Sequence, residues 1–357
     1  MRISLITETY FPQVNGVSRA LGRLVESLVQ HGDSVQLIVP RYGEPDETSP
    51  PVSDRYDFPS VPLPFYREIR LAFARPGSLA MALDGFKPDI VHIATEGPLG
   101  RVALAVVRRR EYPLVTSYHT NFPDYLNYYR CAFLAPLAWR YLRRFHNAGC
   151  ATFCPTRSIS ELLRRRNFKN VIVWGRGVEC ERFSPGKRDD ALRLSLGVQE
   201  NEVMLLYVGR LANEKNLRML LHAFYRLDAS RRGKLVFVGD GPMRSKLEGQ
   251  GGADTVFTGY KRGEELARHY AAADLFVFPS VTETFGNVIL EAMAAGVPAV
   301  GFDAPGPRDI IREGVTGTVV KERTEAALAA AIQQLSAGRA ALKRMGTCAR
   351  EYALTQT

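Results

Sequence analysis

The feature that most constrains the fold of this chain is a regular alternation of short apolar segments with segments of helical period. The first series of apolar runs predicts strands at 2–7, 34–39, 90–94, 114–118, 151–155 and 171–174. The second series predicts strands at 203–208, 235–238, 255–257, 275–278 and 298–301. Such alternation is typical of parallel sheets built from βαβ units, so we expect an α/β protein.

The two series are separated by one break, which predicts two domains. Residues 177–187 contain glycine, proline and charged side chains without a strand or helix period. We expect a doubly wound domain at 1–178, a linker at 179–190 and a second doubly wound domain at 191–357. A length of 357 residues suits two domains. Their sheets are expected to face each other across a cleft, because open α/β sheets bind ligands at the carboxyl ends of their strands.

Two segments do not follow the alternation. Residues 41–64 are rich in proline and have no clear period, so we expect a long excursion outside the sheet. The last helical pattern covers about 340–352 and is followed by polar residues.

Composition disfavours a membrane-spanning, secreted or disulfide-bonded protein. The hydrophobic fraction of 46% is ordinary for a folded soluble protein, and no run of about 18 apolar residues predicts a transmembrane helix. The first predicted strand begins at Arg2 and leaves no room for a signal peptide. Five cysteines without Cys-x-x-Cys spacing favour a reduced, cytoplasmic setting.

The net charge of +10 lies mostly before Pro185, in clusters of arginine. One interpretation is solvated helix faces. The other is peripheral contact with anionic lipid at the inner face of the plasma membrane, where each cation near the surface contributes about 1 kcal/mol. Nucleic acid is disfavoured, because no interleaving of aromatic and basic residues occurs. The clusters are 108–110, Arg140 with Arg143 and Arg144, and 164–166.

Two carboxylates eight positions apart surround a segment that contains glycine. Glu283 lies in the loop after a predicted buried strand, and Glu291 lies in the first turns of the next helix. Gly286 lets a phosphate approach the backbone N–H groups at the helix start, where the helix dipole favours anions. The carboxylates can accept hydrogen bonds from a ribose and a hexose. This combination predicts a nucleotide-sugar site.

Two cations follow the first strand of the second series. Arg210 and Lys215 flank the strand-to-helix turn that begins at Gly209. Arginine holds a diphosphate bidentately and lysine acts as a point charge, so both would stabilise the charge that develops if the diphosphate leaves. The alternative is a loop ion pair with Glu214.

Three further motifs are weaker candidates. Gly239 and Asp240 belong to a turn that resembles half of a dinucleotide fingerprint with incomplete glycine spacing. Gly16 can bring backbone N–H groups to the same phosphates. A plain structural turn is the alternative for these glycines, and at Gly239 and Asp240 we favour a turn that lines the nucleotide. His119 follows a first-domain strand and is a candidate for substrate contact or proton handling. The remaining histidines, at 31, 92, 146, 222 and 269, lack such a position.

Several motifs are absent from the sequence. It contains no Asp-x-Asp motif, no Gly-x-Ser-x-Gly elbow, no Walker loop and no His/Cys cluster with metal spacing. Metal dependence, serine hydrolysis and ATPase chemistry are therefore disfavoured. We expect no cofactor other than the nucleotide sugar as co-substrate.

Taken together, these motifs resemble glycosyltransferase family 4, whose members are retaining enzymes with the GT-B fold of two Rossmann-like domains. The resemblance covers nearly the whole chain and is carried, in order, by 177–185, 209–215, 239–242 and 283–291. Residues 8–17 and 118–125 look like bacterial GDP-mannose-dependent α-mannosyltransferases. They look equally like the UDP-sugar enzymes that glycosylate diacylglycerol.

The resemblance implies a role for each candidate residue. Arg210 and Lys215 would bind the donor diphosphate, Glu291 the ribose and Glu283 the hexose. His119 would lie near the hexose at the reaction centre. The implied catalytic residues are His119, Glu283, Arg210 and Lys215. The implied donor-binding residues are Gly16, Gly209, Arg210, Lys215, Gly239, Asp240, Tyr260, Glu283, Phe285, Gly286, Asn287 and Glu291.

The resemblance also implies the reaction. A hexose of mannose or glucose type would pass, without a metal and with retained α configuration, to a hydroxyl of a lipid or glycan acceptor. In many members the leaving phosphate helps deprotonate the acceptor. Two alternatives stay open: a non-catalytic nucleotide-sugar-binding module and a GT-B nucleotide-sugar epimerase. The family usually closes with a helix that returns to the first domain. This chain stops about where that crossover would begin, so we expect either a shortened protein or a looser closure of the two domains.

Overall fold

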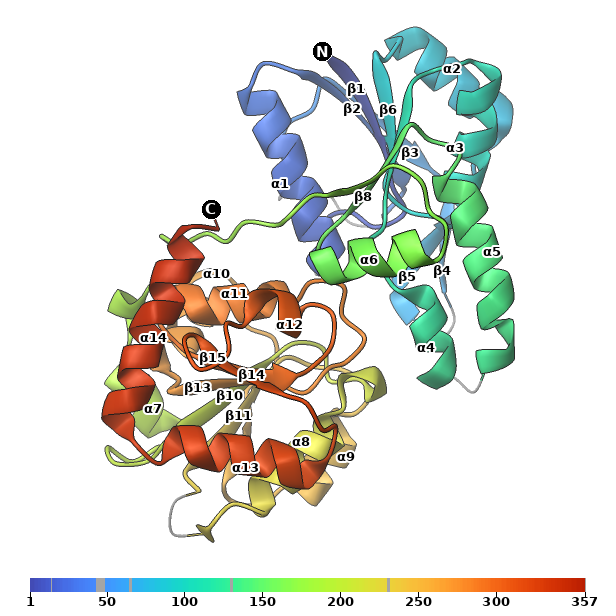
Figure 1. The fold of residues 1–357 in the computed structure, drawn as a ribbon. Helices are drawn as coiled ribbons and strands as arrows, with labels where there is room; N and C mark the ends of the chain where they lie inside the picture. Colours follow the sequence, from blue (N-terminus) through green and yellow to red (C-terminus); the bar gives the residue numbers. More distant parts are fainter. Residues whose placement is uncertain (14, 43–48, 64–65, 129–130, 230–231, 357) are drawn as a thin grey trace. The chain divides into compact units, whose positions relative to one another are not determined.

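The computed structural model of the chain describes residues 1–13, 15–42, 49–63, 66–128, 131–229 and 232–356. It consists of two compact units, Met1–Gly175 and Arg176–Thr357. In each unit, helices lie on both faces of a parallel sheet (Figure 1). The predicted α/β class is confirmed. The second unit includes all of the residues predicted as a linker, 179–190.

The sheet of the first unit has seven parallel strands in the order β3-β2-β1-β6-β7-β8-β9. These strands are β1 (Arg2–Ile6), β2 (Ser34–Pro40), β3 (Asp54–Phe58), β6 (Ile90–Ile93), β7 (Leu114–Ser117), β8 (Ala151–Cys154) and β9 (Val171–Val173). An antiparallel pair is formed by β4 (Ser60–Leu63) and β5 (Tyr66–Ala72). The helices are α1 (Gly16–Gln30), α2 (Pro76–Phe86), α3 (Pro98–Arg109), α4 (Phe122–Tyr128), η1 (Ala132–Leu134), α5 (Ala135–His146) and α6 (Arg157–Arg165).

The expectation of an excursion without strands at 41–64 was wrong for its second half. Strand β3 pairs in parallel with β2, and β4 begins two residues later. The apolar alternation is hidden because β3 is an edge strand, where Arg55 pairs with Asp57 and only Phe58 is buried. Residues 43–48 of the segment lie outside the described residues.

The sheet of the second unit has six parallel strands in the order β12-β11-β10-β13-β14-β15. They are β10 (Met204–Val208), β11 (Lys234–Val238), β12 (Thr255–Phe257), β13 (Leu275–Phe278), β14 (Ala299–Phe302) and β15 (Gly317–Val320). The helices are η2 (Pro185–Lys187), α7 (Asp190–Ser195), η3 (Asn213–Lys215), α8 (Leu217–Tyr225), α9 (Arg244–Gln250), α10 (Gly263–Ala272), α11 (Asn287–Ala294), α12 (Pro307–Ile310), α13 (Glu325–Ser336) and α14 (Arg339–Leu354). The sequence did not predict β15, an edge strand of four residues.

Strand β10 shows why the second unit needs helices on both faces. All five of its residues are buried. Met204, Leu206 and Val208 belong to one apolar cluster, which also contains residues of α11 and α14. The alternate residues Leu205 and Tyr207 belong to the other cluster, with residues of α8 and α13. Since successive side chains of a strand point to opposite faces, both faces are covered and only the loops at the strand ends are available for chemistry.

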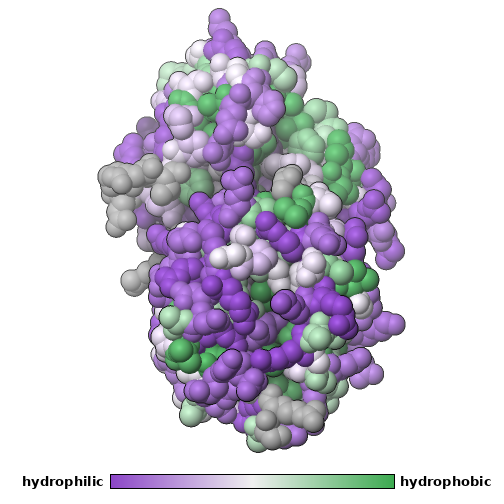
Figure 2. Space-filling view, turned by 90° about the vertical axis from the view of Figure 1, so that its left-hand side faces the viewer, coloured by the Kyte–Doolittle hydropathy of each residue, from purple (hydrophilic) through white to green (hydrophobic). Residues whose placement is uncertain are grey.

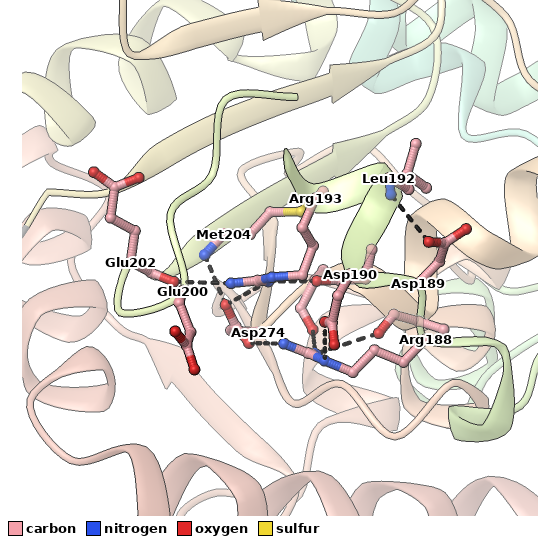
Figure 3. Close-up of polar contacts among 12 residues, drawn as sticks. Arg188, Asp189, Asp190, Leu192, Arg193, Glu200, Glu202, Met204 and Asp274 are labelled. Atoms are coloured by element: carbon pink, nitrogen blue, oxygen red, sulfur yellow. Dashed lines mark hydrogen bonds and ion pairs between the residues drawn. The ribbon is translucent and has the colours of Figure 1, made fainter. Parts of the chain in front are cut away.

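A polar network fixes α7 to the strands at their amino-terminal ends (Figure 3). Arg193 is buried and donates to an Asp274 carboxylate oxygen at 2.9 Å and to the carbonyl of Ala272. Asp274 also accepts from the Met204 backbone N–H at 2.8 Å and from Arg188 at 3.0 Å. The network therefore ties the helix to the starts of β10 and β13.

None of the helices in the described ranges has the length and apolar character needed to span a bilayer. The face shown in Figure 2 is mostly hydrophilic, with scattered apolar side chains.

We expect Asp274→Ala to lower the free energy of unfolding of the second unit by about 3 kcal/mol or more, because it leaves the buried guanidinium of Arg193 without its carboxylate. Urea denaturation measures the change. The control is Asp190→Ala, also in contact with this network (Figure 3) but 86% exposed and 3.8 Å from Arg188. Equal losses in the two variants would contradict a structural role for the Asp274 network.

Candidate functional site

The loops after β10 and β13 lie at the topological switch point of the second sheet. The chain continues from β10 to β11 on one side and from β13 to β14 on the other, and β10 and β13 are neighbours. In open α/β sheets, ligands bind at this position. Several hydrogen bonds among the described residues join the loops. Asn216 donates to the carbonyl of Pro279 at 3.2 Å, and the ammonium group of Lys215 donates to a carboxylate oxygen of Glu283.

Lys215 and Glu283 form an ion pair. From the sequence, Lys215 was assigned to the diphosphate of a donor and Glu283 to its hexose. Their side chains are 15% and 22% exposed, so the pair is largely removed from water. The sequence also offered a loop ion pair with Glu214 as an alternative. In the structure, Glu214 is buried in the same turn, and the ion pair of Lys215 is formed with Glu283. A cation and an anion that suit phosphate and sugar hydroxyls thus lie side by side.

The loop that carries Arg210 is bonded to the loop after β11. The Gly209 N–H donates to the carbonyl of Val238 at 3.0 Å, and the Leu211 N–H donates to the carbonyl of Asp240 at 2.8 Å. Tyr207 donates its hydroxyl to the carbonyl of Arg210 at 3.0 Å. These bonds fix the backbone from which the Arg210 side chain extends.

The turn at Gly239 and Asp240 serves this close approach. Gly239 has a φ of 138°, and a Cβ at this position would lie 2.0 Å from the carbonyl oxygen of Gly209. Asp240 accepts from the Gly241 N–H and from Arg244, and the Arg244 hydrogen bond is the main reason that the pKa of Asp240 is lowered. Tyr260 is exposed and donates to the carbonyl of Asp240 at 3.2 Å. The turn is therefore a structural support at the edge where ligands bind.

The start of α11 has the geometry of an anion site. Gly286 caps the helix in the left-handed region, with a φ of 94°. Phe285 before it is buried, and its carbonyl packs so closely on Gly306 that a Cβ there would lie 2.3 Å away. The side-chain oxygen of Asn287, the first helical residue, is buried without a hydrogen-bond partner among the described residues. The Asn287 side-chain oxygen therefore lies at the positive end of the α11 dipole.

Glu291 lies one turn further along α11 and is buried. It accepts a hydrogen bond from the hydroxyl of Tyr270 at 2.8 Å. This bond fixes the orientation of the carboxylate.

The sequence interpretation assigned no role to Arg176, which the structure places at the same loop. Its guanidinium carbon lies 5.7 Å from the centre of the Phe285 ring. Burial lowers the pKa of Arg176 to about 10, against the opposing effect of the Glu283 carboxylate. The residue follows a predicted strand within Gly-Arg-Gly, but nothing in that pattern indicates a partner more than 100 positions away.

In the first unit, Gly16 and His119 both follow the carboxyl ends of strands. Gly16 is the first residue of α1, whose cap Asn15 accepts from the N–H groups of Val17 and Ser18. Residue 14 of this motif lies outside the described residues. His119 is buried after β7, with its ring 6.3 Å from that of Trp174. Strand β6 lies between β1 and β7, so the two residues do not follow adjacent strands.

Sequence reasoning missed two buried carboxylates at the switch point of the first sheet, between β1 and β6. Glu8 accepts from the Leu99 N–H at the start of α3 at 2.7 Å. Glu96 lies 3.0 Å from the Nε2 atom of His146, whose Nδ1 atom lies 2.9 Å from the Thr116 hydroxyl. We expected His146 to have no place near a strand end. This was wrong, because α5 brings His146 to Glu96, which follows β6 and is 50 positions earlier in the chain. A pairing over that distance leaves no local signal.

The described residues contain no group of three or more histidine, cysteine, aspartate or glutamate side chains arranged to hold a metal ion.

Burial raises the pKa of Glu8 from 4.5 to about 7, and the charge of Glu96 adds to this effect, against hydrogen bonds from Leu99, Gly97 and Thr95. A raised folded pKa means that the native state holds the proton more tightly. Its stabilising contribution is complete below pH 4.5 and is lost as the pH rises through 7. A shift of this size corresponds to about 3 kcal/mol.

We therefore expect the stability of the unmodified protein relative to Glu8→Gln to fall by about 3 kcal/mol between pH 4.5 and pH 8. Glutamine has a similar shape and does not titrate, so the difference isolates Glu8. Urea denaturation of both proteins across this range measures it. A difference that is constant with pH would contradict the raised pKa.

Comparison with known proteins agrees with this geometry. The family described as "Glycosyltransferase Family 4" matches residues 14–182, and "Glycosyl transferases group 1" matches residues 202–337. A GDP-mannose-dependent alpha-mannosyltransferase of Corynebacterium glutamicum is 35% identical over 90% of this chain and 76% of that protein. One of Mycolicibacterium smegmatis is 34% identical over 100% and 94%.

A third sequence relative and one solved structure are also similar to this chain. An alpha-monoglucosyldiacylglycerol synthase of Streptococcus pneumoniae is 31% identical over 89% of this chain and 75% of that protein. The sucrose-phosphate synthase structure from Thermosynechococcus elongatus aligns with a TM-score of 0.81 at 20% identity and covers 99% of this chain and 94% of that one.

The fold is therefore GT-B, as predicted. The chain belongs to glycosyltransferase family 4, which confirms the resemblance inferred from its motifs.

Proposed function

We propose that this protein transfers a hexose of mannose or glucose type from a nucleoside-diphosphate sugar to a hydroxyl of a lipid or glycan, with retention and without a metal. The observation that carries the proposal is the Lys215–Glu283 pair at the switch point of the second sheet, next to the start of α11. The mannosyl and glucosyl relatives support the choice of sugar.

The donor would be held by groups that the second unit already orients. Arg210 and Lys215 would neutralise the diphosphate, with the N–H groups at the start of α11. Glu283 and the Asn287 side-chain oxygen would accept from hexose hydroxyls. Glu291, oriented by Tyr270, would accept from the ribose. These cations supply the charge stabilisation that other transferases obtain from a metal.

In the proposed reaction the bond between the anomeric carbon and the diphosphate oxygen breaks, and a bond from that carbon to the acceptor oxygen forms. The acceptor proton passes to the leaving phosphate, so the products are glycoside and nucleoside diphosphate. Arg210 and Lys215 stabilise the charge that develops on the leaving group. His119 is assigned to the hexose side of the reaction centre.

The experiment is a donor screen with GDP-mannose, UDP-glucose, UDP-galactose and UDP-glucuronate, in the presence of EDTA. We expect one donor to raise the melting temperature and to be transferred to diacylglycerol or to a glycan, with an α-anomeric product by NMR. Loss of transfer in EDTA would contradict metal independence, and a β-product would contradict retention. Donor binding without turnover would indicate a binding module. Release of free monosaccharide and nucleotide without an acceptor would indicate an epimerase.

The same assay includes Glu283→Gln and, as a matched control, Glu322→Gln on the exposed surface. Glu283→Gln should lose transfer and keep the far-UV circular dichroism of the unmodified protein. Normal turnover by this variant would refute the site.

We also propose peripheral contact of the first unit with anionic lipid at the cytoplasmic face of the membrane. The support is a set of side chains that we call the α5 surface, in which apolar residues alternate with cations. Phe133 is 77% exposed and Leu137 is 65% exposed, which is unusual for large apolar side chains unless a partner covers them. The complete α5 surface is Phe133, Leu137, Arg140, Tyr141 and Arg144, all of them exposed.

The helical spacing of Leu137, Arg140, Tyr141 and Arg144 places them on one side of α5. An apolar stripe beside arginines suits the boundary between lipid headgroups and acyl chains. The exposed arginines at 108–110 would add to the attraction.

We expect the protein to co-sediment with vesicles of phosphatidylglycerol and phosphatidylcholine at an ionic strength of about 0.1 M. Binding should fall steeply towards about 1 M, where the screening length shortens from about 10 to about 3 Å. Phe133→Ser with Leu137→Ser should weaken binding. Leu194→Ser removes a similarly exposed apolar residue from α7 of the second unit, outside the proposed surface, and should not weaken binding. Salt-independent binding, or equal losses in both variants, would contradict the proposal.

A further inference from the structure

Arg176 is a charged residue near the loop that carries Glu283, and no role has been given to it. It is the first residue of the second unit, and its guanidinium group lies over the ring of Phe285. Phe285 is buried and is two positions from Glu283. Arg176 is also close enough for the Glu283 carboxylate to stabilise its charge. One segment at the unit boundary thus brings a second cation to the carboxylate that already pairs with Lys215.

The ion pair seen in the structure creates a competition when a donor binds. Lys215 donates to Glu283, whereas the proposed function requires the same ammonium group to face a diphosphate. A diphosphate that draws Lys215 away leaves Glu283 as a largely buried carboxylate that has lost its partner. A buried charge without a compensating cation is strongly unfavourable.

A cation that stays on Glu283 removes this penalty. Arg176 suits the task because its guanidinium group has a fixed planar shape and stacks on an aromatic ring. Phe285 belongs to the short loop that ends at Gly286, whose left-handed conformation sets the start of α11. The arginine is therefore held by the same loop that carries Glu283, and the two would move together.

We propose that Arg176 is a positioning residue for the donor sugar: it holds Glu283 in place and balances its charge when the donor diphosphate takes over Lys215. This inference rests on the proposed function. It assigns to Arg176 an action through Glu283, without direct contact with the diphosphate.

A double-mutant cycle tests the inference, with Arg176→Met and Glu283→Gln made singly and together. Methionine keeps apolar contact with the Phe285 ring and removes only the charge. The readout is the dissociation constant of the donor identified in the screen, measured by calorimetry. Arg176→Met should weaken donor binding about tenfold when Glu283 is present and less than about twofold in the Glu283→Gln background.

Two further variants make the result specific. Arg182→Met removes a cation from the same segment of the second unit, but this arginine is 52% exposed and pairs with Glu179, so donor binding should not change. Arg176→Lys keeps the charge and should recover part of the loss. Equal losses from Arg176→Met in both backgrounds would mean that Arg176 contacts the donor directly, and the inference would be overturned. Unchanged binding in Arg176→Met would overturn it as well.

The cycle is also read without donor, from the urea midpoints of the four proteins. Non-additive midpoint shifts show that Arg176 and Glu283 interact, and additive shifts overturn the inference. If the unmodified protein binds none of the four nucleotide sugars, the proposed function fails, and the urea cycle still decides whether Arg176 acts on Glu283.

Discussion

The ion pair between Lys215 and Glu283 is the interaction on which the site depends. It joins the loops after β10 and β13, the two neighbouring strands at which the chain changes direction across the sheet. Because β10 is buried on both faces, chemistry is confined to these loops. A largely buried ion pair adds little net stability, since desolvation of the two charges offsets their attraction. Under the proposed function, the pair has a second role, because phosphate and sugar hydroxyls would take over its two partners.

Backbone packing explains why the glycine pattern departs from a dinucleotide fingerprint. A side chain at Gly239 would collide with the carbonyl oxygen of Gly209, and a side chain at Gly306 would collide with that of Phe285. Both glycines let one loop of the second sheet approach the next. Their spacing therefore follows the packing of neighbouring loops, and only Gly286 lies at the start of a helix of the candidate site. This also explains why the sequence did not indicate Gly306, because its partner Phe285 lies in the loop after another strand.

The sequence predicted those features whose signal is local. Every central strand of both sheets was predicted, because burial on both faces produces continuous apolar runs. The edge strands β3 and β15 were missed, since β3 is rich in charge and β15 begins with glycine and is buried only at its two ends. Lys215 and Glu283 were found because each follows a strong strand signal. The sequence did not indicate Arg176, Glu8, Glu96 or His146, because each meets its partner only in the folded chain. The partner of His146 is 50 positions away, and that of Arg176 is more than 100 positions away.

The two switch points differ in a way that bears on which unit takes the donor. In the first unit, the start of α3 is already occupied by a carboxylate of the protein itself, because Glu8 accepts from the Leu99 N–H. In the second unit, the start of α11 carries a left-handed glycine and a buried oxygen of Asn287 that has no partner among the described residues. A helix start whose N–H group is already bonded to an internal carboxyl group is less available to a phosphate, whereas the start of α11 is close in sequence to Glu283, the partner of Lys215. This asymmetry supports the proposed placement of the donor diphosphate on the second unit.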